Sequence, residues 1–401
     1  MPQRILSMYR AAFVGLPRPV WLLAIAALIN RCGTMVLPFA TLYLTKELGW
    51  TVTDAGLALS FYGAGAMVGS FSGGWLADRI SVRAVLVASL VLNGAGFLAL
   101  EHLESRGAIC WFLVALGTFS EAFRPANATA LAAIAGPVNR VRAFTLYRLA
   151  INLGMSIGPV LGGFLAEYNY RWLFRVDGAT CLAAAAMLAG WFRDPAEHHG
   201  ELKAEDASLA AGRSPWRDGP FVALLGLAVL LAMVFFQIQS TYPLALNSVY
   251  GFSEATIGLA LAVNTVIIVL FEMVLAHALR DAPHLRLVAW GSLLFGVGLA
   301  LLPLGRSFLY VCATIVVWTI GEMLSLPFLQ GVVAERADAK RRGTYLGLLS
   351  LAFSVAYMAG PPVGAWVFER LGPDALWYAC GIAGVILWFG FEALARRVVR
   401  S

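Results

Sequence analysis

The chain has 401 residues, of which 60% are hydrophobic and 13% charged, and its mean hydropathy is +0.77. Soluble proteins carry roughly 45–50% apolar and roughly 25% charged residues, so this composition excludes a soluble globular protein and indicates an integral membrane protein. The net charge of +6 does not indicate nucleic-acid binding, because the basic residues lie in short loops between apolar segments, and the five cysteines lack metal-ligand spacing.

Twelve apolar segments are long enough to cross a bilayer, for which about 20 residues suffice. In the first half they lie near 20–45, 54–78, 84–103, 107–135, 143–167 and 171–192. In the second half they lie near 220–246, 254–279, 285–305, 307–333, 343–369 and 374–395. The stretch 193–219 between the halves is polar and is expected to be a solvated linker.

An internal repeat relates the two halves at an offset of 202 residues. It takes Gly49 to Gly251, Gly56 to Gly258, and the pair Gly158-Pro159 to Gly360-Pro361. In a membrane protein such a repeat predicts two pseudo-symmetric bundles with the substrate site between them. The expected fold is therefore all-α, with a six-helix bundle in residues 1–192, a cytoplasmic linker in 193–219 and a second six-helix bundle in 220–401.

The distribution of Lys and Arg predicts the orientation. With a cytoplasmic N-terminus, the cytoplasmic segments hold about 20 of the 29 basic residues and the opposite side holds five: Lys46, Arg106, Arg171, Arg306 and Arg370. We therefore expect both termini in the cytoplasm and a multi-pass protein of the plasma (inner) membrane. The first apolar run is too long for a cleavable signal peptide and is interpreted as the first span.

The first span contains Asn30 and Arg31, about 11 residues after it begins, or roughly 16 Å at 1.5 Å per residue. Ionisable side chains at that depth are costly and are functional candidates. Arg31 is expected either to pair with a carboxylate across the bundle or to bind an anionic substrate.

The loop between the second and third spans contains Gly74, Asp78, Arg79 and Arg83. It resembles the signature loop of the major facilitator superfamily, although Ser81 and Val82 replace a glycine and a basic residue of that pattern. The twelve spans, the repeat and the central linker are also similar to that family's plan. The resemblance implies a cytoplasmic gate, in which a carboxylate at a helix end pairs with arginines or a helix N-terminus in one conformation only. The alternative is an Asp-Arg pair that only marks a loop between two spans and has no gating role.

The fourth span contains Glu121 and Arg124, which are three residues apart and can share a helix face. The stretch from Arg124 through Asn127 resembles the fourth-helix motif of the same superfamily, where the arginine is tied to proton coupling. Burial raises the pKa of a carboxyl group and a nearby cation lowers it, so a change of conformation can change the charge of such a group, as a proton carrier requires. A permanently ionised structural pair is the alternative.

The fifth span contains Gly154, Gly158, Pro159, Gly162 and Gly163. Small residues at four-residue spacing let helices approach closely, and the proline favours a bend. The stretch resembles the fifth-helix motif of antiporter branches of the superfamily, which implies export; ordinary tight packing is the alternative. The same residues spell a hydrolase-type GxSxG around Ser156, but a mid-helix serine without a histidine partner does not indicate an enzyme.

In the second half, Glu322 is nearly equivalent to Glu121 and has no Lys or Arg near it in the sequence. We expect it either to carry a proton or attract a cation, as the resemblance also implies, or to be a hydrogen-bonded structural acid. Asp177 is expected at the outer interface, and Glu272 is a weaker second acid. Further residues central enough in their spans to line a substrate cavity are Tyr62, Phe119, Asn127, Phe235, Gln237, Asn264 and Trp318, beside Asn30, Arg31 and Glu322.

The sequence contains no nucleotide-binding motif, so the energy for transport must come from an ion gradient or from the concentration gradient of the substrate itself. The expected function is proton-coupled export of amphipathic, mainly cationic small molecules by alternating access, by a monomer that needs no cofactor, metal or nucleic acid. The alternative is a dedicated carrier of a metabolite such as a sugar, peptide or siderophore.

Overall fold

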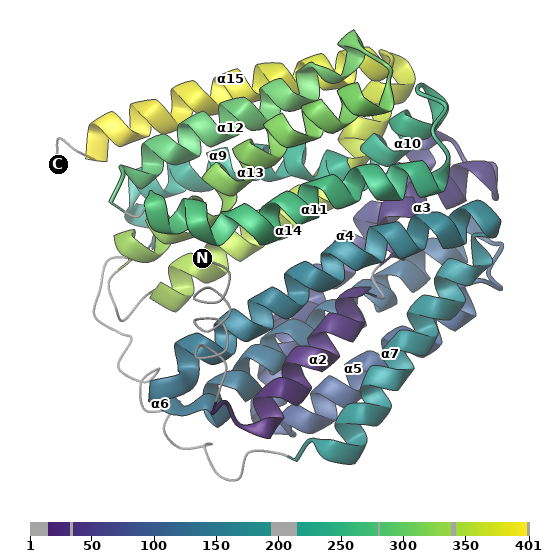
Figure 1. Cartoon of the computed structure of the whole chain (residues 1–401), viewed down its shortest axis with the longest axis vertical. Helices are drawn as coiled ribbons and strands as arrows, with labels where there is room; N and C mark the ends of the chain where they lie inside the picture. The colour runs from purple at the N-terminus through teal and green to yellow at the C-terminus, as the bar shows by residue number, and fades with distance from the viewer. Residues whose placement is uncertain (1–14, 33–34, 194–214, 280, 338–341, 399–401) are drawn as a thin grey trace, which may run out of the picture. The chain divides into compact units, whose positions relative to one another are not determined.

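The computed structural model describes residues 15–32, 35–193, 215–279, 281–337 and 342–398, and every regular element in these ranges is a helix (Figure 1). The first-half helices are α2 (Arg18–Cys32), α3 (Val36–Lys46), α4 (Val52–Arg79), α5 (Val82–Leu100), α6 (Arg106–Tyr168) and α7 (Arg171–Trp191). The second-half helices are η1 (Pro215–Arg217), α9 (Gly219–Phe235), η2 (Phe236–Gln239), α10 (Thr241–Ser248), α11 (Glu254–Ala278), α12 (His284–Ala300), η3 (Leu302–Leu304), α13 (Phe308–Arg336), α14 (Arg342–Arg370) and α15 (Pro373–Val398).

In these ranges, 10 helical segments are long and apolar enough to cross a membrane, which confirms the expected all-helical, multi-pass architecture. The first of them, Arg18–Lys46, contains both α2 and α3. The expected spans near 54–78 and 107–135 are also helical, as α4 and the first part of α6, but are not among the ten.

Helix α6 contains both the fourth and the fifth expected spans. It runs for 63 residues without interruption, which would extend about 95 Å as a straight helix. It folds back on itself, because Arg31 contacts both Glu121 and Gly154 of this helix. The segment between the two expected spans is thus helical and not an irregular loop. Only the part Arg142–Tyr168 is among the ten membrane-crossing segments.

The chain forms two compact units that do not follow the order of the sequence. The first takes the chain up to Val36, then Gly65–Gly158 and the segment from Arg171; the second takes Leu37–Ala64, Pro159–Tyr170 and the chain after the central linker. The chain thus passes between units inside the first span, inside α4 and inside α6. The predicted bundle boundaries follow the sequence repeat and remain a prediction, and linker residues 194–214 lie outside the described part of the chain.

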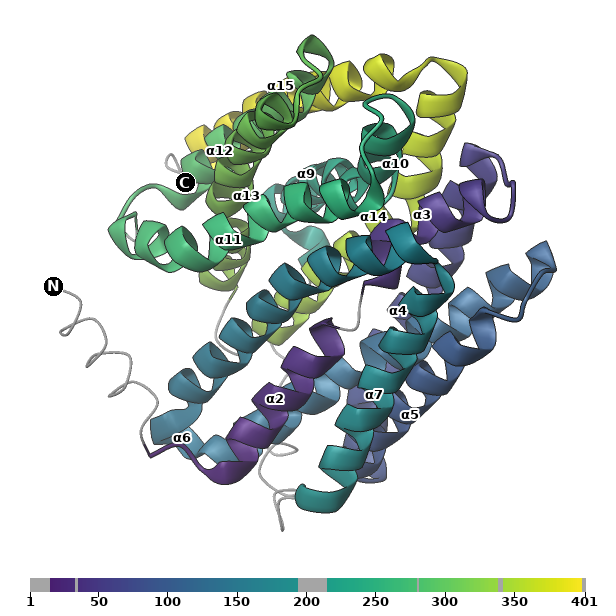
Figure 2. The ribbon, with the colours of Figure 1, turned by 45° about the vertical axis from the view of Figure 1, so that its right-hand side comes forward.

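The core of the first unit lies between α2, α5, α6 and α7. Leu23, Leu86, Leu131 and Leu188 each supply a fully buried side chain from one of these helices. Helices α5 and α7 lie side by side in both views (Figures 1 and 2), because glycines at 94 and 178 let their backbones approach closely.

The core of the second unit lies between α9, α12, α13, α14 and α15, where Phe221, Leu329 and Phe391 are fully buried. Helix α12 packs against both α13 and α15. A side chain at Gly291 or Gly296 would collide with the backbone of α13 or α15, respectively, so these glycines allow the close packing.

Two glycines related by the repeat have the same backbone conformation. Gly49 and Gly251 have φ angles of +65° and +71°, in the left-handed region that favours glycine, and each directly precedes the loop that leads into α4 or α11. The halves therefore share local geometry at the positions that the offset of 202 residues pairs.

Candidate functional site

An ion pair between two helices lies in the first unit. The Nη2 atom of Arg31, in the last turn of α2, is 3.8 Å from the Oε1 atom of Glu121 in α6. The two side chains are only 18% and 19% exposed. Arg124, expected beside Glu121, is exposed. Of the two roles considered for Arg31, the structure therefore places it against a carboxylate of its own unit.

The fifth-helix glycines hold α6 against α2 next to this ion pair. A Cβ atom at Gly154 would lie 2.5 Å from the Cβ of Arg31, and one at Gly158 would lie 3.2 Å from the backbone oxygens of Arg31 and Cys32. These distances are too short for a larger residue, so the motif positions the Arg31 backbone by close helix packing.

Among the described residues, the side chain of Glu322 in α13 has one hydrogen-bond partner, the neutral amide of Asn264. Asn264 of α11 donates a hydrogen bond of 2.8 Å to Glu322 Oε2 and one of 3.0 Å to the hydroxyl of Thr319. Glu322 and Asn264 are partly buried, and no ion pair to Glu322 is formed by residues within the described ranges. A half-buried carboxyl group with neutral neighbours can change its charge without breaking an ion pair.

Helices from the two halves pack reciprocally inside the second unit. Gly56 of α4 lies against Pro361 and Ala365 of α14. Gly258 of α11, which the offset of 202 residues pairs with Gly56, lies against Pro159 of α6. Each contact joins a glycine to the Gly-Pro motif of the other half. The repeat detected in the sequence therefore extends to the contacts between helices.

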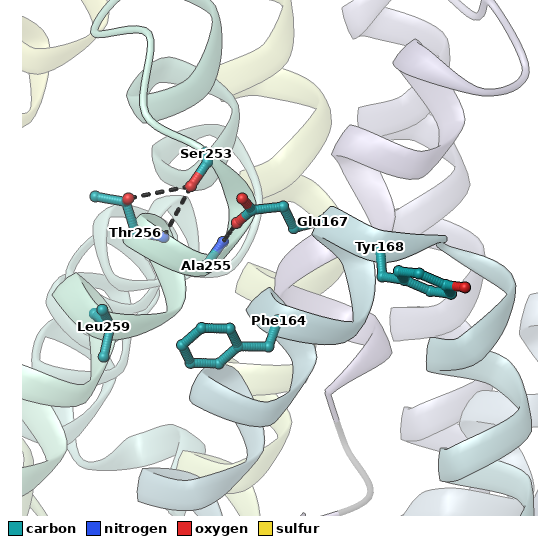
Figure 3. A pocket seen from close by; sticks show the side chains of 7 residues that line it. All are labelled: Phe164, Glu167, Tyr168, Ser253, Ala255, Thr256 and Leu259. Carbon is teal, nitrogen blue, oxygen red and sulfur yellow. Dashed lines mark hydrogen bonds between the residues drawn. The ribbon is translucent and has the colours of Figure 1, made fainter.

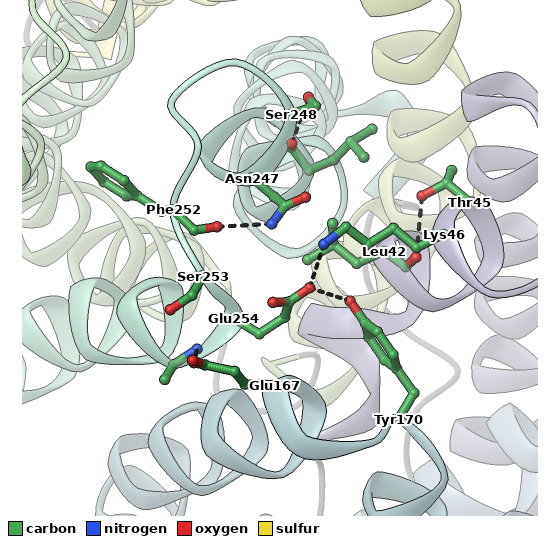
Figure 4. A network of polar contacts seen from close by, with 12 residues as sticks. Leu42, Thr45, Lys46, Glu167, Tyr170, Asn247, Ser248, Phe252, Ser253 and Glu254 are labelled. Atoms are coloured by element: carbon green, nitrogen blue, oxygen red, sulfur yellow. Dashed lines mark hydrogen bonds and ion pairs between the residues drawn. The ribbon is translucent and has the colours of Figure 1, made fainter.

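A polar network joins the expected outer ends of these helices (Figure 4). Glu254, the first residue of α11, is 2.7 Å from Lys46 Nζ at the end of α3 and accepts a 2.6 Å hydrogen bond from the hydroxyl of Tyr170. Burial and this hydrogen bond to Glu254 raise the pKa of Tyr170 above its ordinary value of 10.0, so its hydroxyl stays a donor. Separately, Glu167 of α6 accepts from the backbone N–H of Ala255 at 3.1 Å.

A further contact of the same kind joins α4 to α14, where the backbone N–H of Thr53 donates to Glu369 at 2.8 Å. With Glu254 and Glu167, the second unit has three acidic residues that tie first-half helices to second-half helices. The orientation predicted from Lys and Arg places all of them at the non-cytoplasmic side.

A shallow groove of about 530 Å³ adjoins this network (Figure 3). Its lining combines apolar rings and hydroxyl groups from the end of α6 and the start of α11: Phe164, Glu167, Tyr168, Ser253, Ala255, Thr256 and Leu259. It contains none of the residues predicted for the substrate cavity.

The expected cytoplasmic gate is described only in part. Gly74 lies near Pro125 of α6, Arg79 stacks on the ring of Trp75 at 4.3 Å, and Arg83 donates to the backbone oxygen of Ala189 at the end of α7. The side chain of Asp78 lies outside what the structure describes. The gate therefore remains a prediction.

The remaining predicted cavity residues have different surroundings. Gln237 is buried, donates to the backbone oxygen of Gly360 at 2.8 Å and accepts from Thr241, so it connects η2 to α14. Tyr62 and Trp318 are buried among aromatic side chains, whereas Phe119 and Phe235 are partly buried. Asn127 is fully buried, and its amide has no hydrogen-bond partner in the described part of the protein.

The structure also shows two polar sites that sequence reasoning missed. Asp177, expected at the interface, is fully buried beside Val36, and Asn30 is buried next to Cys181. Glu272 is buried as well.

The second missed site surrounds Asp218, which caps the N-terminus of α9 and binds Arg336 of α13 at 2.6 and 2.7 Å. Burial opposes ionisation of this acid, but the hydrogen bonds from Arg336, Phe221 and Tyr345 and the positive charge of Arg336 together outweigh burial and hold the pKa of Asp218 below its ordinary 3.8. The Asp directly before a Gly-Pro helix start is the signal that could have identified this cap.

Comparisons with known proteins agree with this architecture. The family model of the Major Facilitator Superfamily matches residues 23–282 and 238–399. An uncharacterized MFS-type transporter of Bacillus subtilis, YqjV, is 24% identical over 384 residues, covering 94% of this chain and 92% of its own length. Multidrug resistance protein MdtH of Klebsiella pneumoniae is 26% identical over 370 residues, covering 89% and 90%, respectively.

Solved structures show the same fold. A POT family transporter has a TM-score of 0.80 at 16% identity, covering 96% of this chain and 98% of the other. The nucleoside transporter NupG has a TM-score of 0.82 at 12% identity, covering 94% and 100%. All these proteins are membrane transporters and not enzymes, as expected for this chain.

Proposed function

Because the chain belongs to the Major Facilitator Superfamily, we propose that it is a proton-coupled secondary transporter that exports amphipathic, mainly cationic small molecules by alternating access. The relative named as a multidrug resistance protein, similar over nearly its whole length, supports an efflux role. We further propose that it acts as a monomer in the inner membrane with both termini in the cytoplasm.

The observation that carries this proposal is the environment of Glu322. Its hydrogen-bond partner is the amide of Asn264, which also donates to Thr319, and no cation among the described residues forms an ion pair with the carboxylate. A proton and a lipophilic cation can therefore compete for the same negative charge. Proton entry from the outside would release the cation, and proton loss to the cytoplasm would prepare the site for the next one.

The contacts at the expected outer side support the second part, alternating access. Glu254 and Glu369 tie the outer ends of α3 and α4 to second-half helices. In the proposed cycle, substrate enters from the cytoplasm while these contacts hold. Export then requires that these contacts break. A ligand drives such a change only if it binds the two conformations with different affinity.

The proposal is tested with proteoliposomes that have an acidic lumen, with ethidium, a lipophilic cation, added outside. Transporters inserted with the cytoplasmic face outward are expected to accumulate ethidium in the lumen, and Glu322→Gln is expected to abolish this uptake. Glu335→Gln, in the last turns of the same helix and exposed, is the matched control and should transport normally.

Equal uptake by wild type and Glu322→Gln would remove Glu322 from the mechanism. No uptake of ethidium or of other unrelated lipophilic cations by the wild-type protein would contradict multidrug export. It would favour the alternative, a dedicated carrier of a sugar, peptide or siderophore.

A further inference from the structure

A buried carboxyl group in the first unit takes no part in the function proposed above. Asp177 lies in α7, about 9 Å along the helix axis from its start at Arg171. Its side chain is 0% exposed. Asp177 is therefore inside the unit.

The carboxyl group of Asp177 caps the start of α3. Its Oδ2 atom accepts a hydrogen bond of 3.1 Å from the backbone N–H of Val36, the first residue of α3, and the N–H of Met35 also faces it. Its Oδ1 atom has no hydrogen-bond partner among the described residues. Val36 is also the last residue of the first unit before the chain enters the second. The cap therefore sits at a point where the chain passes between units.

No basic side chain compensates Asp177 in the described part of the unit. Arg175, two residues earlier in α7, binds Glu101 at the end of α5, and Arg31 of α2 is paired with Glu121. Arg83, at the other end of α5, donates to a backbone oxygen of α7.

The titratable groups in electrostatic contact with Asp177 are the thiols of Cys32 in α2 and Cys181 in α7. Cys181 in turn lies 3.8 Å from the Oδ1 atom of Asn30 and accepts from the amide of Asn93 in α5 at 3.6 Å. Asp177 thus adjoins a buried polar cluster that is made of neutral groups.

Two opposing effects act on this carboxyl group. Burial without a cation favours the neutral acid, whereas backbone N–H groups at a helix N-terminus favour the carboxylate. The charge of Asp177 therefore depends on the hydration of this site and on the position of α3.

We propose that Asp177 is a second proton-binding site of the transporter. It holds a proton while it caps α3 inside the first unit, and it releases that proton to water when the N-terminus of α3 is hydrated. This proposal rests on the proton coupling proposed above and adds a site in the other half of the sequence from Glu322.

The direct test is a pH titration of purified, reconstituted full-length protein by infrared difference spectroscopy, which distinguishes the C=O stretch of a protonated carboxyl group from a carboxylate. Asp177→Asn is expected to remove one titrating protonated-carboxyl band. Asp177→Glu is expected to keep a titrating band at a shifted frequency. Asp374→Asn, an exposed acid in the first turn of α15, is the matched control and should leave that band unchanged.

A protonated-carboxyl spectrum that is the same in wild type and Asp177→Asn would overturn the proposal. If Asp177→Asn does not fold, an identical spectrum for wild type and Asp177→Glu has the same meaning. The titration uses no substrate, so a failure of ethidium export would contradict the proposed function without affecting this result.

Discussion

Single side chains join the two halves of the sequence at the expected outer side, and Glu254 binds two different residues there. It binds Lys46, whose side chain is 41% exposed, and Tyr170, which is buried. The exposed ion pair contributes little because water screens it, whereas the buried hydrogen bond to a charged acceptor contributes about 1.5–3 kcal/mol. The closure that we propose at this side therefore depends more on Tyr170 than on Lys46.

Glu254→Gln is expected to weaken this closure, because a neutral amide attracts neither the ammonium group nor the hydroxyl as strongly. A cysteine placed at Thr41, a buried position of α3, should then react faster with a maleimide in an otherwise cysteine-free protein. Glu47→Gln removes an exposed acid one residue after α3 and is the control, expected to leave labelling unchanged. Equal labelling of all three proteins would rule out the closing role of Glu254.

The cap at Asp218 predicts a pH dependence of stability. The pKa of Asp218 in the folded protein lies below its ordinary 3.8, so the carboxylate stabilises the fold above that pH, and this contribution is lost as pH falls through the folded pKa. Asp218→Asn keeps an oxygen acceptor for the cap but removes the charge that binds Arg336. Its melting temperature should be lower than that of wild type at pH 7, and the difference should disappear in acid. A difference that does not depend on pH would show that the charge is unimportant.

At the level of helices, close packing through glycine connects the halves. Gly258 of α11 lies against the backbone of Pro159 in α6, and Gly56 of α4 makes the repeat-related contact with Pro361 in α14. Neither contact has room for a Cβ atom. The fifth-helix motif therefore has a packing role in both units: Gly154 and Gly158 face α2, and Pro159 and Gly163 face α11.

Gly258→Ala is expected to destabilise the folded protein by about 1–3 kcal/mol, because an added methyl group forces α11 away from α6. Gly226→Ala is the control: Gly226 lies in α9 with no atom within 4 Å of the added carbon, so this change should stabilise by about 0.5–1 kcal/mol through helix propensity. Thermal unfolding in detergent measures both changes. A Gly258→Ala protein as stable as the control would contradict the packing argument.

The family and the helical membrane fold were predictable from the sequence, because hydropathy, the loop around Gly74 and the glycine motif are local signals. The family match and the helical structure confirm these two predictions. The pairing of Glu121 was predictable only in part, since Arg31 was expected to pair with a carboxylate but not with this one in particular. Sequence spacing suggested Arg124, but the ion pair forms with Arg31, which is 90 residues away and is brought close by Gly154 and Gly158.

Asp177 shows the same limit of sequence reasoning. Its position near the start of the sixth span suggested the membrane interface, yet helix packing buries it and Val36 binds it. Burial in a membrane protein depends on which neighbouring helix covers a side chain, and hydropathy carries no information on that.

On the scale of the whole molecule, the two compact units place Glu121 and Glu322 in different units. The chain passes between the units within the first span, α4 and α6, at Val36, Ala64 and Gly158. Alternating access is the cycle that we propose for this chain. The central claim is that this cycle exchanges protons for substrate.

Simultaneous recording of ethidium and proton movement in proteoliposomes tests that claim most directly. An outward-directed ethidium gradient, without an imposed pH gradient, should drive protons in the opposite direction, and Glu322→Gln should abolish this counterflow. Ethidium movement by the wild-type protein without any proton movement would contradict proton coupling.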